Sequence, residues 1–339
     1  MVQGMGRGMT QRQKILVVIA LLALVAMAVP FTNSFVILLA TRVLVFSILA
    51  MSVDLLLGFT GLSSLGQAAY LGIGTYMAGI LATKYGFGLD ASFWVVIVLG
   101  MLGGAALAAF FGLFAIRATG TYFLMITLAL GQCIWGLAYR WNSLTGGDNG
   151  LNMPRKPEFW GLKLSHDVTM FYVAFCFFAV SLIALYSITR SPFGRSLEGI
   201  RERELRMSIL GYNVWLHKYM AFVIAGAFGG LAGVLWAHTN GIISPEDLVL
   251  TMSVDALLMV VLGGAGTLIG AVLGCALVLA LREYLSTLVP WWQYALGLVY
   301  ILTILYLPNG LMGLPAQIRS MRSGSKEGAG NKQPAAVGH

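Results

Sequence analysis

Apolar segments long enough to cross a lipid bilayer follow one another along almost the whole chain. A bilayer core about 30 Å thick requires roughly 17 to 25 apolar residues per helix. Such segments lie near 15–31, 35–57, 64–82, 92–116, 121–139, 168–188 and 219–239. Of the 339 residues, 58% are hydrophobic and only 10% are charged, whereas about 25% are charged in a soluble domain. The sequence therefore predicts an all-α polytopic membrane protein.

The residue patterns of several other classes of protein are missing. The three cysteines, Cys133, Cys176 and Cys275, lie inside apolar segments without paired or metal-ligand spacing, so neither a disulfide framework nor a metal site is expected. The net charge is +8, and the basic residues responsible for it lie at the ends of apolar segments. Membrane topology explains basic residues at such positions. Nucleic acid is therefore not an expected partner.

The first apolar segment has two interpretations. Arg7, Arg12 and Lys14 precede it, and Ala26-Met27-Ala28 offers the small-residue pattern of a signal-peptide cleavage site. The same basic flank would hold the start of an uncleaved first helix in the cytoplasm. Because every later element is also a membrane span, we favour a retained helix that follows a cytoplasmic N-terminus over 1–14.

The charges of the connecting loops decide how often the chain crosses the membrane. Loop 189–218 holds six lysines and arginines and is expected in the cytoplasm, whereas loop 240–253 holds none and is expected outside. The tail after residue 307 is again basic, so an odd number of crossings must follow residue 253. GGAGTLIG (263–270) supplies the extra crossing if its glycines divide 254–281 into two short helices, before a last span near 285–307. About ten transmembrane segments result.

The expected organisation follows from this topology. The transmembrane domain covers 15–315, with a cytoplasmic loop over 189–218 and a periplasmic loop over 140–167. A helix over 254–262 would be only about 14 Å long, so it must be buried in protein rather than face lipid. Residues 316–339 are rich in Gly, Ala and Lys and lack apolar periodicity, so we expect a disordered cytoplasmic tail.

The cytoplasmic loop concentrates charge in an otherwise apolar chain, since six of the nine residues from Glu198 to Arg206 are charged. Read as one helix over 197–210, it places Glu202 and Arg206 at i, i+4 and gathers apolar residues on one side. The alternatives are a solvated connector, a helix on the membrane surface and a docking helix for a protein partner. Mixed charges suit anionic lipid poorly, so docking to a protein is favoured.

Four stretches of the chain are similar to one known family. They are GFTGLSSLGQAAYLGIGTY (58–76), LTGGDNGL (144–151), IRERELRMSILGYNVWLHKYMAF (200–222) and SPEDLVLTMSVDALLMVVLGGAGTLIGAVLG (244–274). Together they resemble the permease subunits of branched-chain amino-acid ABC importers, and the M-type subunit more than the H-type. The resemblance extends over about 40–315 and departs from the family pattern at Gln67, where many relatives have histidine.

The resemblance implies a transporter subunit rather than an enzyme. In such importers a homologous second permease forms a heterodimer, two ATP-binding subunits dock on the cytoplasmic side and a periplasmic substrate-binding protein delivers the substrate. The implied location is the bacterial inner membrane, with both termini cytoplasmic. No lysine of this chain follows a glycine, so the Gly-Lys-Ser/Thr of a phosphate-binding loop is missing. ATP is therefore expected on the partner subunits, and no cofactor on this chain.

Two docking surfaces are implied by the same resemblance. The cytoplasmic loop becomes a coupling helix, ending near residue 211, that docks into an ATP-binding subunit. Its expected contact residues are Glu198, Arg201, Glu202, Arg203, Glu204, Arg206, Met207, Leu210 and Gly211. The substrate-binding protein is expected on the periplasmic loop, at Asp148, Asn149, Arg155, Lys156 and Glu158, although turn formation alone would explain the glycines of that loop.

A substrate pathway is expected where small and polar residues interrupt the apolar segments. The candidates are Ser63, Ser64, Gly66 and Gln67 in the third segment, Thr121, Tyr122, Thr127 and Gln132 in the fifth, and Gly263, Gly264 and Gly266 in the broken stretch. Hydroxyls, an amide and bare backbone suit a small zwitterion, whose charges they can solvate without trapping it. The alternative is that the glycines serve only for helix packing.

The expected activity is uptake of branched-chain or related amino acids, with urea, short amides or aromatic acids as alternative substrates. A self-sufficient ion-coupled transporter is the runner-up, but it would need a buried acid or histidine relay, for which Asp54 is the candidate. Asp255 begins the short helix, where the helix dipole favours an acid. An intramembrane enzyme would need a motif such as His-Glu-x-x-His, which the sequence lacks.

Overall fold

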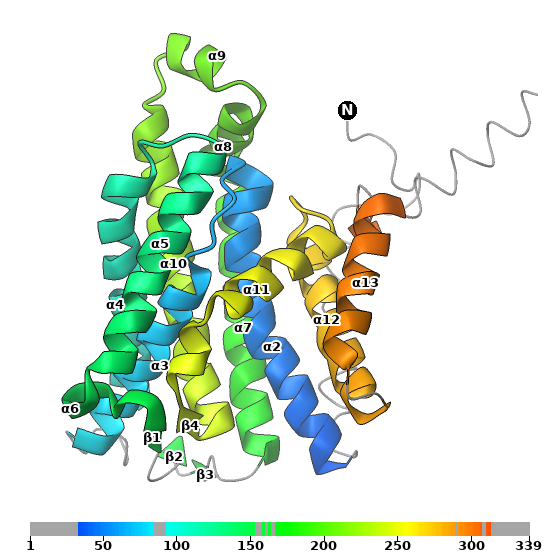
Figure 1. The fold of residues 1–339 in the computed structure, drawn as a ribbon. Coiled ribbons are helices and arrows are strands. Elements are labelled where there is room, and N and C mark those ends of the chain that lie inside the picture. Colours follow the sequence, from blue (N-terminus) through cyan, green and yellow to red (C-terminus); the bar gives the residue numbers. More distant parts are fainter. Residues whose placement is uncertain are drawn as a thin grey trace, which may run out of the picture.

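The computed structural model describes residues 33–84, 93–152, 158–159, 162–163, 167–288, 291–306 and 310–312, and within them the chain is almost entirely helical (Figure 1). The longer helices are α2 (Ser34–Asp54), α3 (Gln67–Lys84), α4 (Phe93–Ala115), α5 (Thr121–Arg140), α7 (Asp167–Arg190), α10 (Val214–Asn240) and α12 (Leu268–Leu288). The shorter ones are α6 (Asn142–Thr145), α8 (Pro192–Glu202), α9 (Glu204–Ile209), α11 (Leu250–Gly263), α13 (Trp292–Tyr306), the π-helix η2 (Leu55–Thr60) and the 3-10 turns η3 (Gly147–Asn149) and η4 (Pro245–Leu248). Four short strands are β1 (Leu151–Asn152), β2 (Glu158–Phe159), β3 (Leu162–Lys163) and β4 (Ile242–Ile243).

Six of the described helices are long and apolar enough to cross a membrane. They are α4, α5, α7, α10, α12 and the continuous stretch Ser34–Thr60 formed by α2 and η2. The predicted all-α polytopic fold is thereby confirmed. Three further predicted segments correspond to α3, α11 and α13, which lack the combined length and hydropathy of a full span. The predicted segment 15–31 lies outside the described residues, so the count of about ten is not confirmed.

The predicted break in the glycine-rich stretch is present. α11 ends at Gly263 and α12 begins at Leu268, and between them Gly264 and Gly266 have φ values of 109° and 89°. Residues with a side chain rarely adopt such values, so glycine permits the reversal of the chain. α11 and α12 consequently pack against each other on either side of the turn.

Helix α10 forms the centre of the bundle, where it packs against α2, α3 and α4. All its residues from Gly229 to Thr239 are buried. A Cβ added at Gly230 would overlap the carbonyl oxygen of Gly100 on α4, and one added at Gly74 on α3 would overlap the carbonyl oxygen of Gly230. The three helices therefore touch backbone to backbone, the close approach that small residues permit in membrane bundles.

The two ends of the bundle carry different structures. Helices α8 and α9 lie at one end, and the strands lie at the other (Figure 1). There β1 pairs antiparallel with β4, and β2 with β3. The described parts of loop 140–167 and the start of loop 240–253, at β4, thus lie at one end of the molecule, opposite loop 189–218. The rest of loop 240–253 runs into the bundle, where Leu248 packs against Gly72 of α3 and Ser253 bonds to Ala68 in the first turn of α3. Which end faces the cytoplasm stays a prediction.

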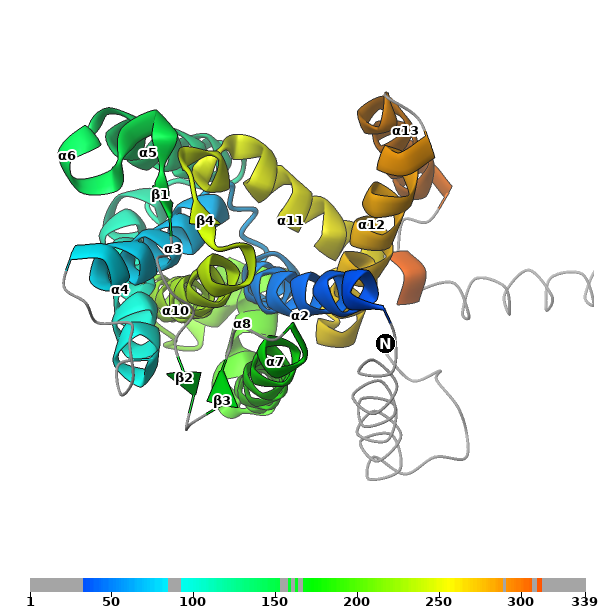
Figure 2. The same ribbon diagram turned by 90° about the horizontal axis from the view of Figure 1, so that it is seen from below.

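Helix α11 connects the main bundle to the α12–α13 pair. η4 and α11 contact α3 and α5, and α11 then reaches α12 and α13. Figure 2 shows α11 crossing between these two parts of the molecule, and no described helix covers it on the side between α5 and α13. This side of α11 is therefore open in the isolated chain.

Replacing Gly230 by alanine is expected to destabilise the protein, because the added methyl group would push α10 away from the Gly100 carbonyl. We expect a loss of about 1–3 kcal/mol of stability, measured as a lower midpoint of thermal unfolding in detergent. Gly136→Ala on α5 is the matched control, since nothing lies within 4 Å of its added Cβ. Equal midpoints for the two variants would contradict the backbone-to-backbone packing.

Candidate functional site

The charged loop folds into two helices, not one. α8 and α9 are separated by Arg203, whose backbone is extended with φ −153° and ψ 93°. The expected single helix over 197–211 is therefore wrong. The reason is tertiary, because α8 buries Leu197 and Ile200 against the bundle while α9 buries none of its residues. The helix breaks where the anchored part meets the exposed part.

The ion pairs expected along a single helix are replaced by a longer-range one. The ion pairs among the described residues join Glu204 to Lys218 and Asp255 to Arg282, and neither involves Glu202 or Arg206. Lys218 Nζ on α10 lies 2.7 Å from Glu204 Oε2 at the start of α9. This contact holds α9 over the beginning of α10.

Helix α9 exposes apolar side chains to solvent at the end of the molecule. Leu205 and Ile209 are 78% and 79% exposed, and Leu210 is 65% exposed. They line a shallow hollow together with Arg203 and Arg206. Large apolar side chains surrounded by charge are typical of a surface that another protein covers.

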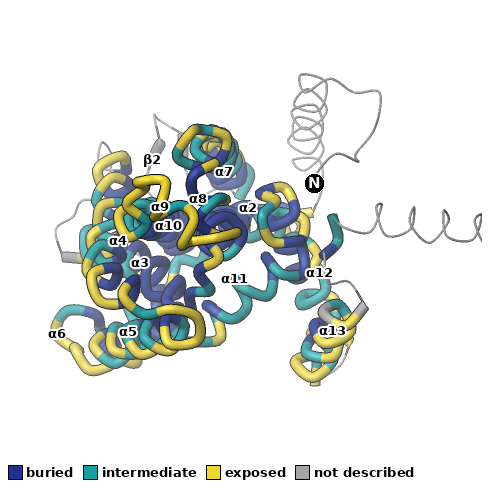
Figure 3. The backbone as a smooth tube through the Cα atoms, turned by 90° about the horizontal axis from the view of Figure 1, so that it is seen from above, coloured by how far each residue is buried: buried dark blue, intermediate teal, exposed yellow. Residues whose placement is uncertain are grey.

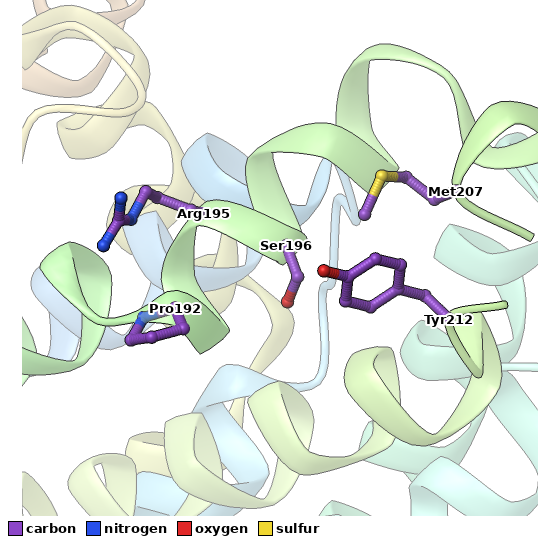
Figure 4. A pocket seen from close by; sticks show the side chains of 5 residues that line it. All are labelled: Pro192, Arg195, Ser196, Met207 and Tyr212. Atoms are coloured by element: carbon purple, nitrogen blue, oxygen red, sulfur yellow. The ribbon is translucent and has the colours of Figure 1, made fainter. Parts of the chain in front are cut away.

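A second hollow, of about 320 Å³, separates α9 from α8. Its lining residues are Pro192, Arg195, Ser196, Met207 and Tyr212. Figure 4 shows Met207 and the Tyr212 ring on one side, Pro192 and Arg195 on the other, and Ser196 between them. α8 and α9 thus present exposed apolar side chains among mixed charges, with arginines at both hollows. We call residues 192–212 the coupling segment, after the role that the family resemblance implies for this loop.

Arg201 fastens the coupling segment to the π-helix η2, next to the α11–α12 turn. Its guanidinium Nη1 donates a hydrogen bond to the Gly58 carbonyl in η2. Next to it, the Gly266 N–H donates to Asp54 Oδ1 at 2.6 Å, and a Cβ added at Gly58 would overlap both Gly266 N and Asp54 Oδ1. Asp54, Gly58, Arg201 and Gly266 form one contact group, which we call the inner hub. It joins α8, the end of α2 and the α11–α12 turn.

The inner hub changes the interpretation of three residues. Arg201 was expected to contact an ATP-binding subunit, Gly266 to line the pathway, and Asp54 was the candidate for an ion relay. The structure brings the three together: Asp54 is fully buried, accepts a backbone hydrogen bond and lies within electrostatic range of the Arg201 guanidinium. Sequence reasoning missed this group because its members lie far apart along the chain.

The first candidate pathway segment is an irregular stretch inside the bundle. Residues 61–66 connect η2 to α3, which begins at Gln67. Ser64 and Gln67 are buried and Ser63 is half-buried. The Gln67 side-chain amide has no hydrogen-bond partner among the described residues. A buried amide without a partner is unusual and marks a candidate for contact with a polar substrate.

Neighbouring helices satisfy the backbone of this stretch. Leu65 N–H donates to Thr127 Oγ1 on α5 at 3.2 Å, and Ala68 N–H donates to Ser253 Oγ on α11 at 2.8 Å. A Cβ added at Gly66 would lie 3.3 Å from the Thr127 carbonyl oxygen. Ser253 had no expected role, because no local pattern of residues marks it. The short helix α11 thus meets the start of α3.

The remaining pathway candidates lie in separate places. Thr121 and Tyr122 are exposed in the first turn of α5, and Tyr122 is 74% exposed. Gln132 is half-buried and follows Gly131, whose added Cβ would approach Gly66. The candidates in the broken stretch belong to the α11–α12 turn rather than to residues 61–67; these are Gly263, Gly264 and Gly266.

The candidate docking residues of loop 140–167 are described only in part. Asp148 and Asn149 are exposed in η3. Glu158 lies in β2, which pairs with β3. Arg155 and Lys156 lie outside the described residues. Close by, Asp247 in η4 accepts a hydrogen bond from the Trp236 indole at 2.8 Å; burial raises its pKa, although this bond partly opposes the shift.

Comparison with known proteins identifies the family. Residues 35–307 match the model of a family described as branched-chain amino acid transport system / permease component. The chain belongs to this family. The permease is 30% identical to the high-affinity branched-chain amino acid transport system permease protein LivM of Salmonella typhimurium, over 95% of the chain and 80% of that protein.

The permease is also similar to a second kind of permease protein. It is 27% identical to LivH of Escherichia coli K12, over 80% of the chain and 92% of that protein. A probable LivM of Methanocaldococcus jannaschii is 24% identical over 78% of the chain and 89% of that protein. No solved structure matches the chain. These relatives are named as transport permeases, which agrees with a transporter rather than an enzyme.

Asp54→Leu is expected to loosen the inner hub, because it removes the acceptor of the half-buried Gly266 N–H. An unsatisfied buried donor costs about 1–3 kcal/mol. We expect a lower unfolding midpoint and faster trypsin cleavage at the arginines of the coupling segment. Asp54→Asn is the matched control, since its amide oxygen can still accept this hydrogen bond. Wild-type stability and cleavage in Asp54→Leu would show that the hub does not fasten the segment.

Proposed function

We propose that the permease is the transmembrane subunit of an ATP-binding cassette importer that takes up branched-chain or related amino acids. A periplasmic binding protein delivers the substrate, and separate ATP-binding subunits supply the energy. The observation that carries this proposal is the coupling segment, whose exposed apolar side chains are fastened through Arg201 to the interrupted helices. Family membership supplies the substrate class.

The coupling segment has the properties of a docking surface for an ATP-binding subunit. Leu205, Ile209 and Leu210 fill a groove on the partner, and their burial there would stabilise the complex by the hydrophobic effect. The arginines around them set orientation more than affinity, since exposed charges contribute little on their own. The remaining predicted contacts, such as Glu198 and Gly211, lie on the same segment.

Motion of the coupling segment reaches the pathway through two connections. Arg201 connects α8 to η2, which continues into residues 61–66, and Asp54 connects α2 to the α11–α12 turn. Ser63, Ser64, Gly66 and Gln67 lie directly beyond η2 and line the pathway in this proposal. Hydroxyls and an unpartnered amide there can solvate a small polar substrate without holding it tightly.

The assembly proposed for the permease contains a second, homologous permease subunit. Similarity to both LivM and LivH supports this, because those two proteins are named as permeases of the same kind of system. The binding protein docks at the end that holds the strands, with Asp148 and Asn149 exposed to it. In the bacterial inner membrane the chain crosses about ten times, with both termini cytoplasmic. ATP is bound by the partner subunits, and this chain holds no cofactor.

The alternatives differ in substrate or in energy source. An importer for urea, short amides or aromatic acids would use the same coupling segment, so the substrate class rests on the family. A self-sufficient ion-coupled transporter would use Asp54 as a relay. The hydrogen bond from Gly266 to Asp54 gives this acid a structural role, which supports the ATP-driven alternative. Uptake by the purified chain alone under an ion gradient would favour the ion-coupled transporter.

The double variant Leu205→Asp/Ile209→Asp is expected to abolish co-purification with the ATP-binding subunits and ATP-dependent uptake. Two charges would have to be buried unpaired in the groove, at several kcal/mol. Insertion and the unfolding midpoint should stay near wild type, because both positions are about four-fifths exposed. The control is Leu205→Met/Ile209→Met, which keeps an apolar surface of similar volume. Undiminished co-purification of the Asp variant would contradict the docking role.

A further inference from the structure

An ion pair lies within the apolar helices, away from the coupling segment. Arg282 Nη1 on α12 is 3.5 Å from Asp255 Oδ2 on α11. Arg282 belongs to a helix that is long and apolar enough to cross the membrane. Charged side chains at such positions are costly and usually serve function, commonly along a substrate path. Neither side chain takes part in the inner hub or in the contacts of residues 61–67.

The charged groups of Asp255 and Arg282 are not in close contact. Its N–O distance of 3.5 Å exceeds the length of about 2.7–2.9 Å of a charge-assisted hydrogen bond. The side chains of Arg282 and Asp255 remain 37% and 24% exposed in the isolated chain. A guanidinium has five N–H donors and a carboxylate has two acceptor oxygens. Both groups therefore keep free hydrogen-bonding capacity.

Two aromatic residues of α13 lie at the pair. The guanidinium of Arg282 lies over the ring of Trp292, 5.1 Å from its centroid. Tyr300 is 8% exposed, and its hydroxyl has no hydrogen-bond partner among the described residues. This hydroxyl lies within electrostatic range of both Asp255 and Arg282. A buried hydroxyl without a partner, within electrostatic range of two charges, is a second observation that points to a polar ligand.

Asp255 lies on a partly exposed face of α11. Thr251 is exposed, and Val254, Asp255 and Leu258 are half-buried. These residues are spaced as one face of a helix. Figures 2 and 3 show no described helix over the side of α11 between α5 and α13. On the buried face of the same helix, Ser253 bonds to the start of α3. The short helix α11 thus carries Asp255 of the pair and also contacts the candidate pathway.

We propose that Asp255 and Arg282 hold the ammonium and carboxylate groups of a small zwitterion, such as an α-amino acid, on its way through the membrane. This inference rests on the proposed function, since it names the substrate contact within the permease. The ammonium group takes the place of Arg282 beside Asp255, and the carboxylate takes the place of Asp255 beside Arg282. The Tyr300 hydroxyl donates to the carboxylate.

The Asp255–Arg282 pair suits transport because the charged groups of the substrate can replace its contacts one for one. When the zwitterion enters, each charge of the pair changes partner, so neither charge is left unpaired. When it leaves, Asp255 and Arg282 pair again. Binding is therefore weak enough for release, whereas an isolated buried charge would hold its counter-ion. A ligand with one charge satisfies only half of the pair.

If Asp255 and Arg282 served only to hold α11 against α12, apolar side chains could do the same. Replacing a buried ion pair by apolar residues of similar volume is often neutral or stabilising. The double variant Asp255→Leu/Arg282→Met should therefore keep the fold, and its unfolding midpoint should equal or exceed that of the wild type. The double variant removes the charged groups that would bind a zwitterion but keeps the helix packing. It therefore distinguishes a role in substrate binding from a role in holding the two helices together.

The test uses the complete transporter in proteoliposomes, with its ATP-binding subunits and binding protein. L-leucine uptake, ATP hydrolysis and the unfolding midpoint are measured for Asp255→Asn, Arg282→Gln and the double variant. We expect uptake to fall by about tenfold or more in all three, while ATP hydrolysis stimulated by the loaded binding protein stays near wild type. Glu283→Gln, the neighbouring acid on α12, is the matched control and should leave uptake unchanged.

The outcomes separate this inference from the proposed function. Normal uptake in the double variant would overturn the zwitterion site. A parallel fall of uptake, ATP hydrolysis and midpoint in the double variant would also overturn it, because the pair would then only fasten helices. If instead the wild-type complex does not couple ATP hydrolysis to L-leucine uptake, the proposed function fails first. Partial recovery of uptake in Asp255→Glu is expected, since it keeps the charge.

Discussion

Inside an apolar bundle, each backbone N–H that loses its helical partner needs another acceptor within the protein, because lipid offers none. This permease interrupts its helices around residues 61–66 and 264–267 and meets part of the requirement with side chains of other helices. Asp54 accepts from Gly266, Ser253 from Ala68, and Thr127 from Leu65. The positions of α3, α5, α11 and α12 relative to one another depend on these hydrogen bonds.

The same contacts explain how one end of the molecule can act on its interior. Arg201 binds the Gly58 carbonyl immediately before the 61–66 stretch, and Gly58 touches the turn that Asp54 holds. No side chain larger than hydrogen fits at Gly58 without moving this turn. The coupling segment and both helix interruptions therefore form one mechanical unit. α9, which buries none of its residues, is left free for a partner.

Features set by local pattern were predictable from the sequence. The span expected at 121–139 is observed as Thr121–Arg140, because apolar length and composition decide it. The break between α11 and α12 was predictable because its glycines and the loop charges agreed. The coupling helix was mispredicted, since its amphipathic pattern runs on through Arg203 while burial of α8 alone divides it.

The candidate site was predictable only as separate parts. Gln67 and Ser64 were recognisable as polar residues in an apolar segment, whereas the hydrogen bond between Asp54 and Gly266 joins residues 212 positions apart. Asp255 was expected at the start of the short helix, where the helix dipole favours an acid, but α11 begins at Leu250 and has no acid in its first turn, so that explanation was wrong. Only the packing of α11 against α12 places Arg282 beside Asp255. Pairings across such distances depend on helix packing, which no local pattern encodes.

The most direct measurement is the distance between spin labels at Glu198→Cys on α8 and Ala265→Cys in the α11–α12 turn, two exposed positions on either side of the inner hub. It is taken in the assembled transporter without nucleotide and with ATP, with a label at Asp148→Cys to report movement relative to the far end. If the hub makes these parts one unit, the distance from Glu198 to Ala265 stays constant while the distance from Glu198 to Asp148 changes. A change in the first distance on ATP binding would contradict the mechanical unit.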